Sequence, residues 1–305
     1  MIEMEDWIYS ELDAFTNRIN QKKYDVAFIG EKTNLDDRSI WAKEYLHLQS
    51  EKVNKVTFDI DASELKVGDN SYNIRSYENI NIFSGQVLID ATTLSIPELI
   101  YLFLIAKIKK QSFDLLYLEP SEYSASNEVD GDFVTKNFSL SEDGKGIIPL
   151  PLFNYPINNR KIAVALGFEG HRFGALLQSD EYNESSIASL FGVPPFYLGW
   201  ERYSFDKNEK HLNEILKYRA DSIKVAGAND PYLNYQVLKK IYKSEAARIQ
   251  VEAINLAAFG TKPVAVALAW FAVNNDNVGV LYDFPNKKEK RSEGHGKVHL
   301  WSFTA

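Results

Sequence analysis

Residues 255–285 read NLAAFGTKPVAVALAWFAVNNDNVGVLYDFP and decide the fold. A short apolar run ends at a Gly-Thr-Lys-Pro turn, an apolar segment follows, and a second short run rich in valine closes the stretch. Pro263 suits the first turn of a helix, so we expect a helix over 262–274 between two strands. Two buried strands joined by a helix predict a parallel pair.

The same alternation runs through most of the chain. Further strands are expected at 24–29, 53–61, 86–90, 113–118, 161–166, 195–199, 248–254 and 277–283. A helix is expected to follow the turn at Gly30 and to end at about His47, and further helices are expected at 96–109 and 229–244. This pattern predicts an α/β fold with two Rossmann-like, parallel-sheet halves and a C-terminal β-strand extension.

Four parts are expected along the chain. An amphipathic helix occupies residues 1–20, and the first Rossmann-like half covers 21–120. Residues 121–154 are polar and rich in serine, glycine and acids, which is typical of a linker or an excursion. The second half covers 155–305 and ends in a basic hairpin.

Two spans of the chain resemble each other. Asp90 to Tyr117 and Asn255 to Tyr282 are both 27 residues apart, and they end in the similar sequences LLYLEP and VLYDFP. Each contains a strand, a polar turn, a helix that begins near a proline, and a second strand. The similarity predicts either an internal duplication or two independent α/β halves.

The composition excludes several classes of protein. The chain has 305 residues, a net charge of −8 and no cysteine. Disulfides, thiolate metal sites and cysteine nucleophiles are therefore excluded, and a cytoplasmic location is expected. The acidic balance does not favour nucleic acid over the whole surface. The longest apolar run, Leu99 to Ala106, is too short for a bilayer, so no membrane association is expected.

Five polar turns follow the predicted strands, and ligands in open parallel sheets bind at such turns. Glycines allow close approach to the backbone, and helix N-termini favour anions. The candidate ligand-binding residues in these turns are Gly30, Thr92, Gly167, Asn229, Gly260, Thr261 and Lys262. The alternative is that Thr261 caps its helix and Lys262 is solvated.

The sequence GFEGHR, residues 167–172, places polar groups directly after an apolar strand. If the protein is an enzyme, Glu169, His171 and Arg172 are the candidates for base, acid and phosphate clamp. Their spacing matches no specific catalytic motif, and His171 could simply begin a helix.

The C-terminal region 287–297 is locally basic. Arg291, Ser292 and His295 are candidates for contact with phosphates, and nucleic acid could bind only through this patch. A solvated hairpin loop that leads into the last strand is the alternative. His295 and His299 do not lie on a helix, so no metal site is expected, and no cofactor motif is present.

The segment NLAAFGTKPVAVALAWFA resembles the strand–turn–helix element of CARF-type Rossmann domains, which sense cyclic oligonucleotides in prokaryotic antiviral defence systems. LIDATTLSIPELIYLFL is more weakly similar to another such turn. Phe259 stands where these motifs usually carry a second glycine. The resemblance implies that Thr261 and Lys262 line a phosphate pocket.

Three functions remain open from the sequence. The first is a sensor or defence component that binds an anionic, nucleotide-like ligand. The second is an enzyme that hydrolyses a nucleotide or nucleic acid. The third is a non-catalytic scaffold, in which the N-terminal segment docks onto a protein partner or a second copy of the chain. Neither the ligand nor the oligomeric state follows from the residues.

Overall fold

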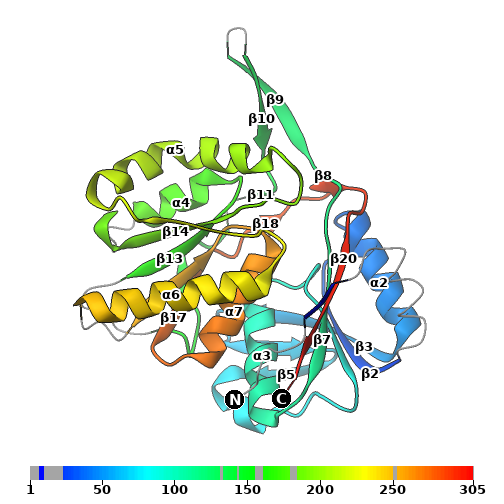
Figure 1. Ribbon diagram of the computed structural model, residues 1–305. Helices are drawn as coiled ribbons and strands as arrows, with labels where there is room; N and C mark the ends of the chain where they lie inside the picture. The colour runs from blue at the N-terminus through cyan, green and yellow to red at the C-terminus, as the bar shows by residue number, and fades with distance from the viewer. Residues whose placement is uncertain are drawn as a thin grey trace. The chain divides into compact units, whose positions relative to one another are not determined.

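The computed structural model describes residues 7–9, 23–130, 133–142, 144–154, 161–178, 184–249 and 253–304, with the side chains of a few of these left undescribed. The chain forms two compact units. The first unit comprises residues 1–124 together with 287–305, and the second comprises 125–286. Each unit contains its own sheet with helices packed on it (Figure 1).

The first unit is built on a mixed sheet with the strand order β1-β20-β7-β6-β2-β3-β4-β5. Its four central strands, β7, β6, β2 and β3, are parallel, whereas β20 is antiparallel to β7 and β4 is antiparallel to both β3 and β5. The strands are β1 (Trp7–Tyr9), β2 (Tyr24–Gly30), β3 (Ser50–Asp59), β4 (Glu64–Val67), β5 (Asn70–Asn73), β6 (Val87–Asp90), β7 (Phe113–Leu118) and β20 (Val298–Phe303).

Helices α2 (Asp37–Gln49) and α3 (Ile96–Lys109) cover opposite faces of this sheet (Figure 1). Right-handed crossovers explain the arrangement, because β2–α2–β3 and β6–α3–β7 extend the sheet in opposite directions. A short 3-10 helix, η1 (Ile74–Asn79), precedes β6. β8 (Glu122–Tyr123) and β19 (Ser292–Glu293) form a small antiparallel pair.

The second unit has the strand order β12-β17-β16-β13-β14-β15, and all of its strands except β12 are parallel. The strands are β12 (Ile148–Pro149), β13 (Ile162–Leu166), β14 (Ile187–Gly192), β15 (Ile223–Ala226), β16 (Ile254–Ala258) and β17 (Val278–Tyr282). The helices are α4 (Gly170–Leu177), η2 (Glu184–Ser186), α5 (Trp200–Tyr218), α6 (Pro231–Ile249) and α7 (Lys262–Asn274).

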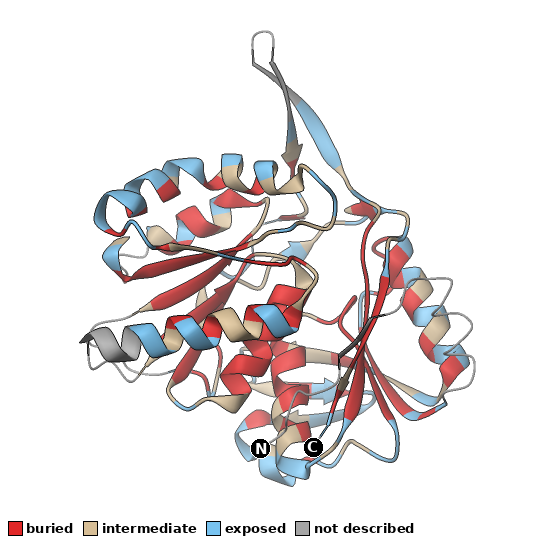
Figure 2. Cartoon of the chain, viewed as in Figure 1, coloured by how far each residue is buried: buried red, intermediate tan, exposed pale blue. Residues whose placement is uncertain are grey.

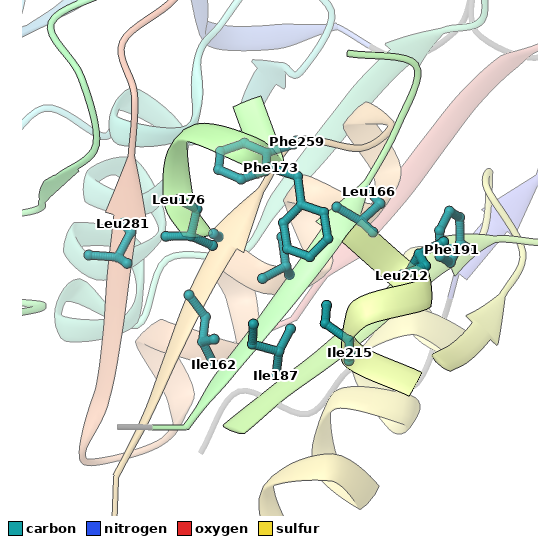
Figure 3. Close-up of a cluster of buried hydrophobic side chains, with 12 residues drawn as sticks. Ile162, Leu166, Phe173, Leu176, Ile187, Phe191, Leu212, Ile215, Phe259 and Leu281 are labelled. Atoms are coloured by element: carbon teal, nitrogen blue, oxygen red, sulfur yellow. The ribbon is translucent and has the colours of Figure 1, made fainter. Parts of the chain in front are cut away.

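The core of the second unit lies on both faces of its sheet. Phe173 and Leu176 of α4 and Leu212 and Ile215 of α5 pack onto one face, as Figure 3 shows. Helices α6 and α7 pack together on the other face (Figure 1). All residues of α7 from Pro263 to Val273 are buried, and so are all residues of strands β13, β16 and β17, whereas Val225 of the edge strand β15 is exposed (Figure 2). A helix that is apolar all round is typical of a protein interior.

Both units have a Rossmann-like topology, which confirms the predicted α/β fold. In the second unit, β14 and β15 lie on one side of β13, and β16 and β17 lie on the other. In the first unit, β3 lies on one side of β2, and β6 and β7 lie on the other. The direction of chain progression therefore reverses between β13 and β16 and between β2 and β6, and such switch points are where α/β sheets bind ligands.

The two similar spans occupy equivalent places in the two sheets. Tyr117 lies in β7 and Tyr282 lies in β17, which are the last parallel strands of their units. The equal spacing does not extend to the first strand of each span, because Asp90 ends β6 whereas Asn255 lies near the start of β16. A duplication therefore stays a prediction.

Several expected boundaries are wrong. The strand expected at 195–199 is β14, Ile187–Gly192, and a loop with consecutive prolines follows it; proline cannot donate to a strand ladder. The strand expected at 248–254 begins only at Ile254, because α6 continues to Ile249. The expected polar linker contains a β-hairpin, β9 (Ala125–Asp130) and β10 (Phe133–Phe138), followed by β11 (Ser141–Glu142) and then β12.

Both ends of the chain also differ from expectation. Within the predicted N-terminal helix, Trp7–Tyr9 is the strand β1 and pairs with β20; the rest of residues 1–20 lies outside the described part. Residues 287–305 belong to the first unit and not to the second, because β20 pairs with β7. The chain returns to the first unit at β18 (Asn286–Lys287). Among the described residues, no helix is both long enough and apolar enough to cross a membrane.

Candidate functional site

The five polar turns lie where the sequence predicts, at the carboxyl ends of parallel strands. Two belong to the first unit, after β2 and β6, and three belong to the second unit, after β13, β15 and β16. Parallel strands end at one edge of a sheet, so each unit gathers its own turns at one edge.

A basic pocket lies at this edge of the first unit. Its volume is about 410 Å³, and its lining residues are Glu31, Lys32, Thr33, Asn34, Leu35, Lys43, Lys55, Lys287 and Glu289. Four lysines against two glutamates leave a net charge of +2 at neutral pH. We call it the lysine pocket.

Four segments of the first unit bring these lysines together. Lys32 lies in the loop between β2 and α2, Lys43 lies on α2, and Lys55 lies on β3. The parallel pairing of β2 with β3 places Lys55 beside Ile29, close to the turn at Gly30. Lys287 arrives from the C-terminal segment. Within the described residues, Lys32, Lys43 and Lys55 have no ion-pair partner for their ammonium groups.

Lys287 is held at the switch point between β2 and β6. Its ammonium group donates to the Thr93 carbonyl at 2.9 Å, and the Gly30 N–H donates to Thr93 Oγ1 at 2.8 Å. Gly30 lies so close that an added Cβ would be 2.8 Å from the Thr93 backbone. Thr93 therefore fills the crevice between β2 and β6, and the pocket opens beside it.

Thr92 has a structural role. Its hydroxyl accepts from the Leu118 N–H at 3.1 Å, and the residue is buried. Asp90 accepts hydrogen bonds from the N–H groups of Thr92 and Thr93 and from the Thr93 hydroxyl. Burial raises the pKa of Asp90, and these hydrogen bonds offset part of that rise. The turn at Thr92 is thus internally bonded, and Thr92 is not placed to contact a ligand.

The N-terminus of α2 is occupied by the chain's own side chains. Asp36 is the N-cap residue, and it accepts the Ser39 N–H at 3.0 Å while Ser39 Oγ accepts the Asp36 N–H at 3.0 Å. This capping box satisfies the Ser39 N–H of the first turn, and it places the buried Asp36 carboxylate, rather than an external anion, at this helix end. The positive charge of the pocket therefore comes from lysines and not from a helix end.

Asp36 also forms the centre of a buried cluster behind the pocket loop. Asp36 Oδ2 accepts from Arg38 Nη2 at 2.9 Å and from Ser292 Oγ at 2.7 Å, and it lies 3.5 Å from Arg291 Nε. Burial alone would raise the pKa of Asp36, but Arg38, Arg291 and Ser292 outweigh it and hold the pKa well below its usual range. Burial and the charge of Arg38 lower the pKa of Arg291.

This depressed pKa makes the stability of the first unit depend on acid pH. A carboxylate with a lower pKa in the folded state stabilises the fold above its unfolded pKa of about 4, and the contribution is lost as the pH falls further. Asp36→Asn keeps the cap. We expect the difference in unfolding free energy between wild type and Asp36→Asn to be constant above about pH 5 and to shrink below about pH 4. Urea unfolding at several pH values measures it, with the exposed Asp69→Asn as the control.

The turns of the second unit are engaged in internal contacts. Thr261 is the N-cap residue of α7, but its hydroxyl donates to the Ala228 carbonyl at 2.7 Å and makes no side-chain cap. The Gly167 carbonyl accepts from Asn208 Nδ2 at 2.9 Å, and a Cβ on Gly167 would be 2.6 Å from the Phe259 carbonyl oxygen. Lys262, Asn229 and Gly260 are half-buried. The alternative that Thr261 caps the helix therefore holds for its position at the N-cap but not for its side chain.

The three candidate catalytic residues do not converge. Arg172 donates to both oxygens of Asp283, at 2.6 and 2.7 Å, and its guanidinium lies 3.5 Å from Glu169 Oε2. Glu169 Oε1 accepts the N–H and the hydroxyl of Ser141 at 2.9 and 2.8 Å. His171 is exposed at the start of α4. Glu169 and Arg172 thus belong to a structural network, and His171 stands apart from it.

The basic tail does not form one continuous surface. Lys287 lines the lysine pocket, whereas Arg291 and Ser292 point into the buried Asp36 cluster. His295 is exposed, and His299 is buried with Nε2 2.7 Å from Glu119 Oε1. The described residues contain no group of three potential metal ligands. Arg291 and Ser292 are therefore not available to a ligand, contrary to the expectation.

Two regions that the sequence singles out contribute residues to the lysine pocket. The turn that begins at Gly30 supplies Glu31, Lys32 and Thr33, although Gly30 itself does not line the pocket, and the basic run 287–297 supplies Lys287 and Glu289. Lys43 and Lys55 were not identified, because their place depends on which face of α2 and β3 they occupy. The parallel register of β2 and β3 is the signal that could have found Lys55.

No protein-family model and no curated protein matches the chain. The geometry of the lysine pocket is therefore the basis for a functional proposal.

Proposed function

We propose that this protein binds an anionic, phosphate-bearing ligand of the nucleotide type in the lysine pocket of its first unit. One observation carries the proposal: four lysines from four separate segments line one pocket at the carboxyl edge of parallel strands. Lysines gathered in one place repel one another, and the two glutamates of the lining offset only half of their charge, so a bound anion would relieve the remaining repulsion.

The chemistry of the lining favours phosphate over a single carboxylate. Lysine acts as a point charge and is a common phosphate ligand, whereas a carboxylate is bound best by the planar fork of arginine. No arginine lines the pocket, and its net charge of +2 suits a ligand with more than one negative charge. Thr33 and Asn34 add groups that can donate hydrogen bonds to phosphate oxygens.

The lining also indicates which part of a nucleotide the pocket would hold. Leu35 is the single apolar residue among the nine that line it, and no aromatic residue is present. Bases are usually bound by stacking on aromatic side chains. The pocket is therefore suited to the phosphates, and affinity should depend little on the base.

Calorimetric titration with inorganic phosphate, pyrophosphate, tripolyphosphate, ATP and adenosine tests the proposal. We expect affinity to rise with the number of charges, ATP to bind about as well as tripolyphosphate, and adenosine not to bind. Binding should weaken as salt is added, because exposed charges are screened. Failure of every phosphate compound to bind, or equal binding of adenosine and ATP, would overturn the proposal.

The proposal differs in place from what the CARF resemblance implies. That resemblance puts the phosphate contacts at Thr261 and Lys262 of the second unit, whereas the lysine pocket belongs to the first. A role as a sensor in antiviral defence stays a prediction. It requires that the ligand be a signal nucleotide, so recovery of such a nucleotide from protein purified from its own host would test it.

A further inference from the structure

The C-terminal segment 287–294, here called the strap, runs along the loop that forms the pocket. The Lys290 N–H donates to the Leu35 carbonyl, and the Gly294 N–H donates to Asp37 Oδ2 at 2.7 Å. Between these bonds, Arg291 and Ser292 reach the carboxylate of Asp36. Four residues of the strap therefore bind residues 35–37, at the end of the loop that lines the pocket and the start of α2.

The same strap supplies two residues to the pocket. Lys287 and Glu289 line it, and both lie within the three residues that precede the anchored residues 290–292. Only one residue separates Glu289 from Arg291, so a shift of Arg291 should also move Glu289, which lines the pocket. Lys287 is fixed in addition through Thr93, which bonds to Gly30.

The anchor itself is buried and specific. Ser292 Oγ both accepts from Arg38 Nε at 3.0 Å and donates to Asp36 Oδ2 at 2.7 Å, and Ser292 is buried. Arg38 Nη1 also lies 3.4 Å from the Leu118 carbonyl, at the end of β7. On its other side the strap pairs with β8, where Ser292 faces Tyr123. The strap is thus held by a hydrogen-bond network and not only by backbone pairing.

We infer that Arg291 and Ser292 are positioning residues for ligand binding, which act by docking the strap so that Lys287 and Glu289 complete the lysine pocket. This inference rests on the proposed function. Arg291 and Ser292 touch no ligand; they set the place of the residues that do. Charged contacts between Lys287 and a phosphate should then be lost when either anchor is removed, even though Lys287 itself remains.

A double-mutant cycle on tripolyphosphate binding tests the inference. Arg291→Gln leaves the Asp36–Arg38 pair in place, so the protein should fold. We expect Lys287→Ala and Arg291→Gln each to raise Kd about tenfold, and the double variant to raise it no more than the larger single effect. Additive effects, or wild-type affinity in Arg291→Gln, would overturn it.

Two further variants separate positioning from general loss of structure. Ser292→Ala removes one hydroxyl and no charge, and it should also raise Kd. Arg219→Gln removes another buried arginine, which pairs with Asp221 in the second unit, and it should leave Kd unchanged. Equal loss of affinity in Arg219→Gln would show a general effect and contradict the inference.

Hydrogen exchange without ligand keeps the two proposals distinguishable. The amides of Lys290 and Gly294 should exchange faster in Arg291→Gln than in wild type, whereas strands β2 and β3 should be unchanged. Unchanged exchange at Lys290 would overturn the docking role even if affinity fell. If wild-type protein binds no phosphate compound, the proposed function fails and the binding role fails with it; if it binds and Arg291→Gln binds equally, only this inference fails.

Discussion

Lys55→Glu is expected to weaken tripolyphosphate binding about thirtyfold. An exposed pair of charges about 4 Å apart contributes about 1 kcal/mol in a water-like environment. Reversing the charge removes that attraction and adds a repulsion of similar size, so the loss is about 2 kcal/mol. The same substitution at Lys43 should have a similar effect, because Lys43 lines the same pocket from α2. Calorimetry at physiological ionic strength, about 0.15 M, measures both.

The matched control is Lys52→Glu. Lys52 is exposed, lies on β3 with Lys55, and does not line the pocket. The two positions are an odd number of residues apart, so their side chains point to opposite faces of the sheet. Both variants change the net charge equally, and Lys52→Glu should stay within about twofold of wild type, because charges beyond a Debye length are screened. Equal losses in the two variants would indicate general attraction and not a pocket.

Arg172→Met is expected to destabilise the second unit by about 3–5 kcal/mol, because it leaves the buried Glu169 carboxylate and the half-buried Asp283 carboxylate without their cation. The side chains of Arg172 and Asp283 are 12% and 14% exposed, and Arg172 also lies over the Phe259 ring at 4.8 Å. Arg172 joins the segment that follows β13 to the segment that follows β17, so its loss should make the amides of both strands exchange faster. Urea unfolding gives the size of the effect, and hydrogen exchange locates it in the second unit.

Arg202→Met provides the comparison for this prediction. Arg202 pairs with Asp206 at 3.4 Å, but its side chain is 80% exposed. Exposed pairs contribute about 0–1 kcal/mol, so this variant should be close to wild type in stability. If Arg172→Met unfolds at the urea concentration of Arg202→Met, the Glu169–Arg172–Asp283 network is not structural, and a role for Arg172 in catalysis becomes the better explanation.

The sequence predicted the elements whose signals are local. Helices 96–109 and 262–274 have the predicted bounds, because a proline in the first turn marks where each begins and each is continuously apolar. The alternating residues 297–303 predicted a strand, but not its partner. Strand β20 pairs with β7 about 180 residues earlier, with Val298 opposite Leu118. The residues around 297–303 contain no signal for so distant a partner. The sequence therefore predicts that residues 287–305 belong to the second unit, whereas they belong to the first.

The candidate site shows the same division. Gly30 was placed at a ligand edge because a glycine turn after an apolar strand is a local signal. The four lysines come together only through the register of β2 and β3, the orientation of α2 and the return of the strap. Likewise, the sequence predicts Arg172 as a phosphate clamp, whereas in the structure its guanidinium donates to both carboxylate oxygens of Asp283. In both cases, residues far apart in the sequence determine whether a candidate side chain is available to a ligand.

Acetylation of lysines, read by mass spectrometry with and without tripolyphosphate, tests the central claim most directly. Protection reports which lysines the ligand covers, without any substitution. The lysine pocket predicts slower acetylation of Lys32, Lys43, Lys55 and Lys287 in the presence of tripolyphosphate, with Lys52 and Lys262 unchanged. Protection of Lys262 with unchanged acetylation of the pocket lysines would contradict the account and place the ligand in the second unit.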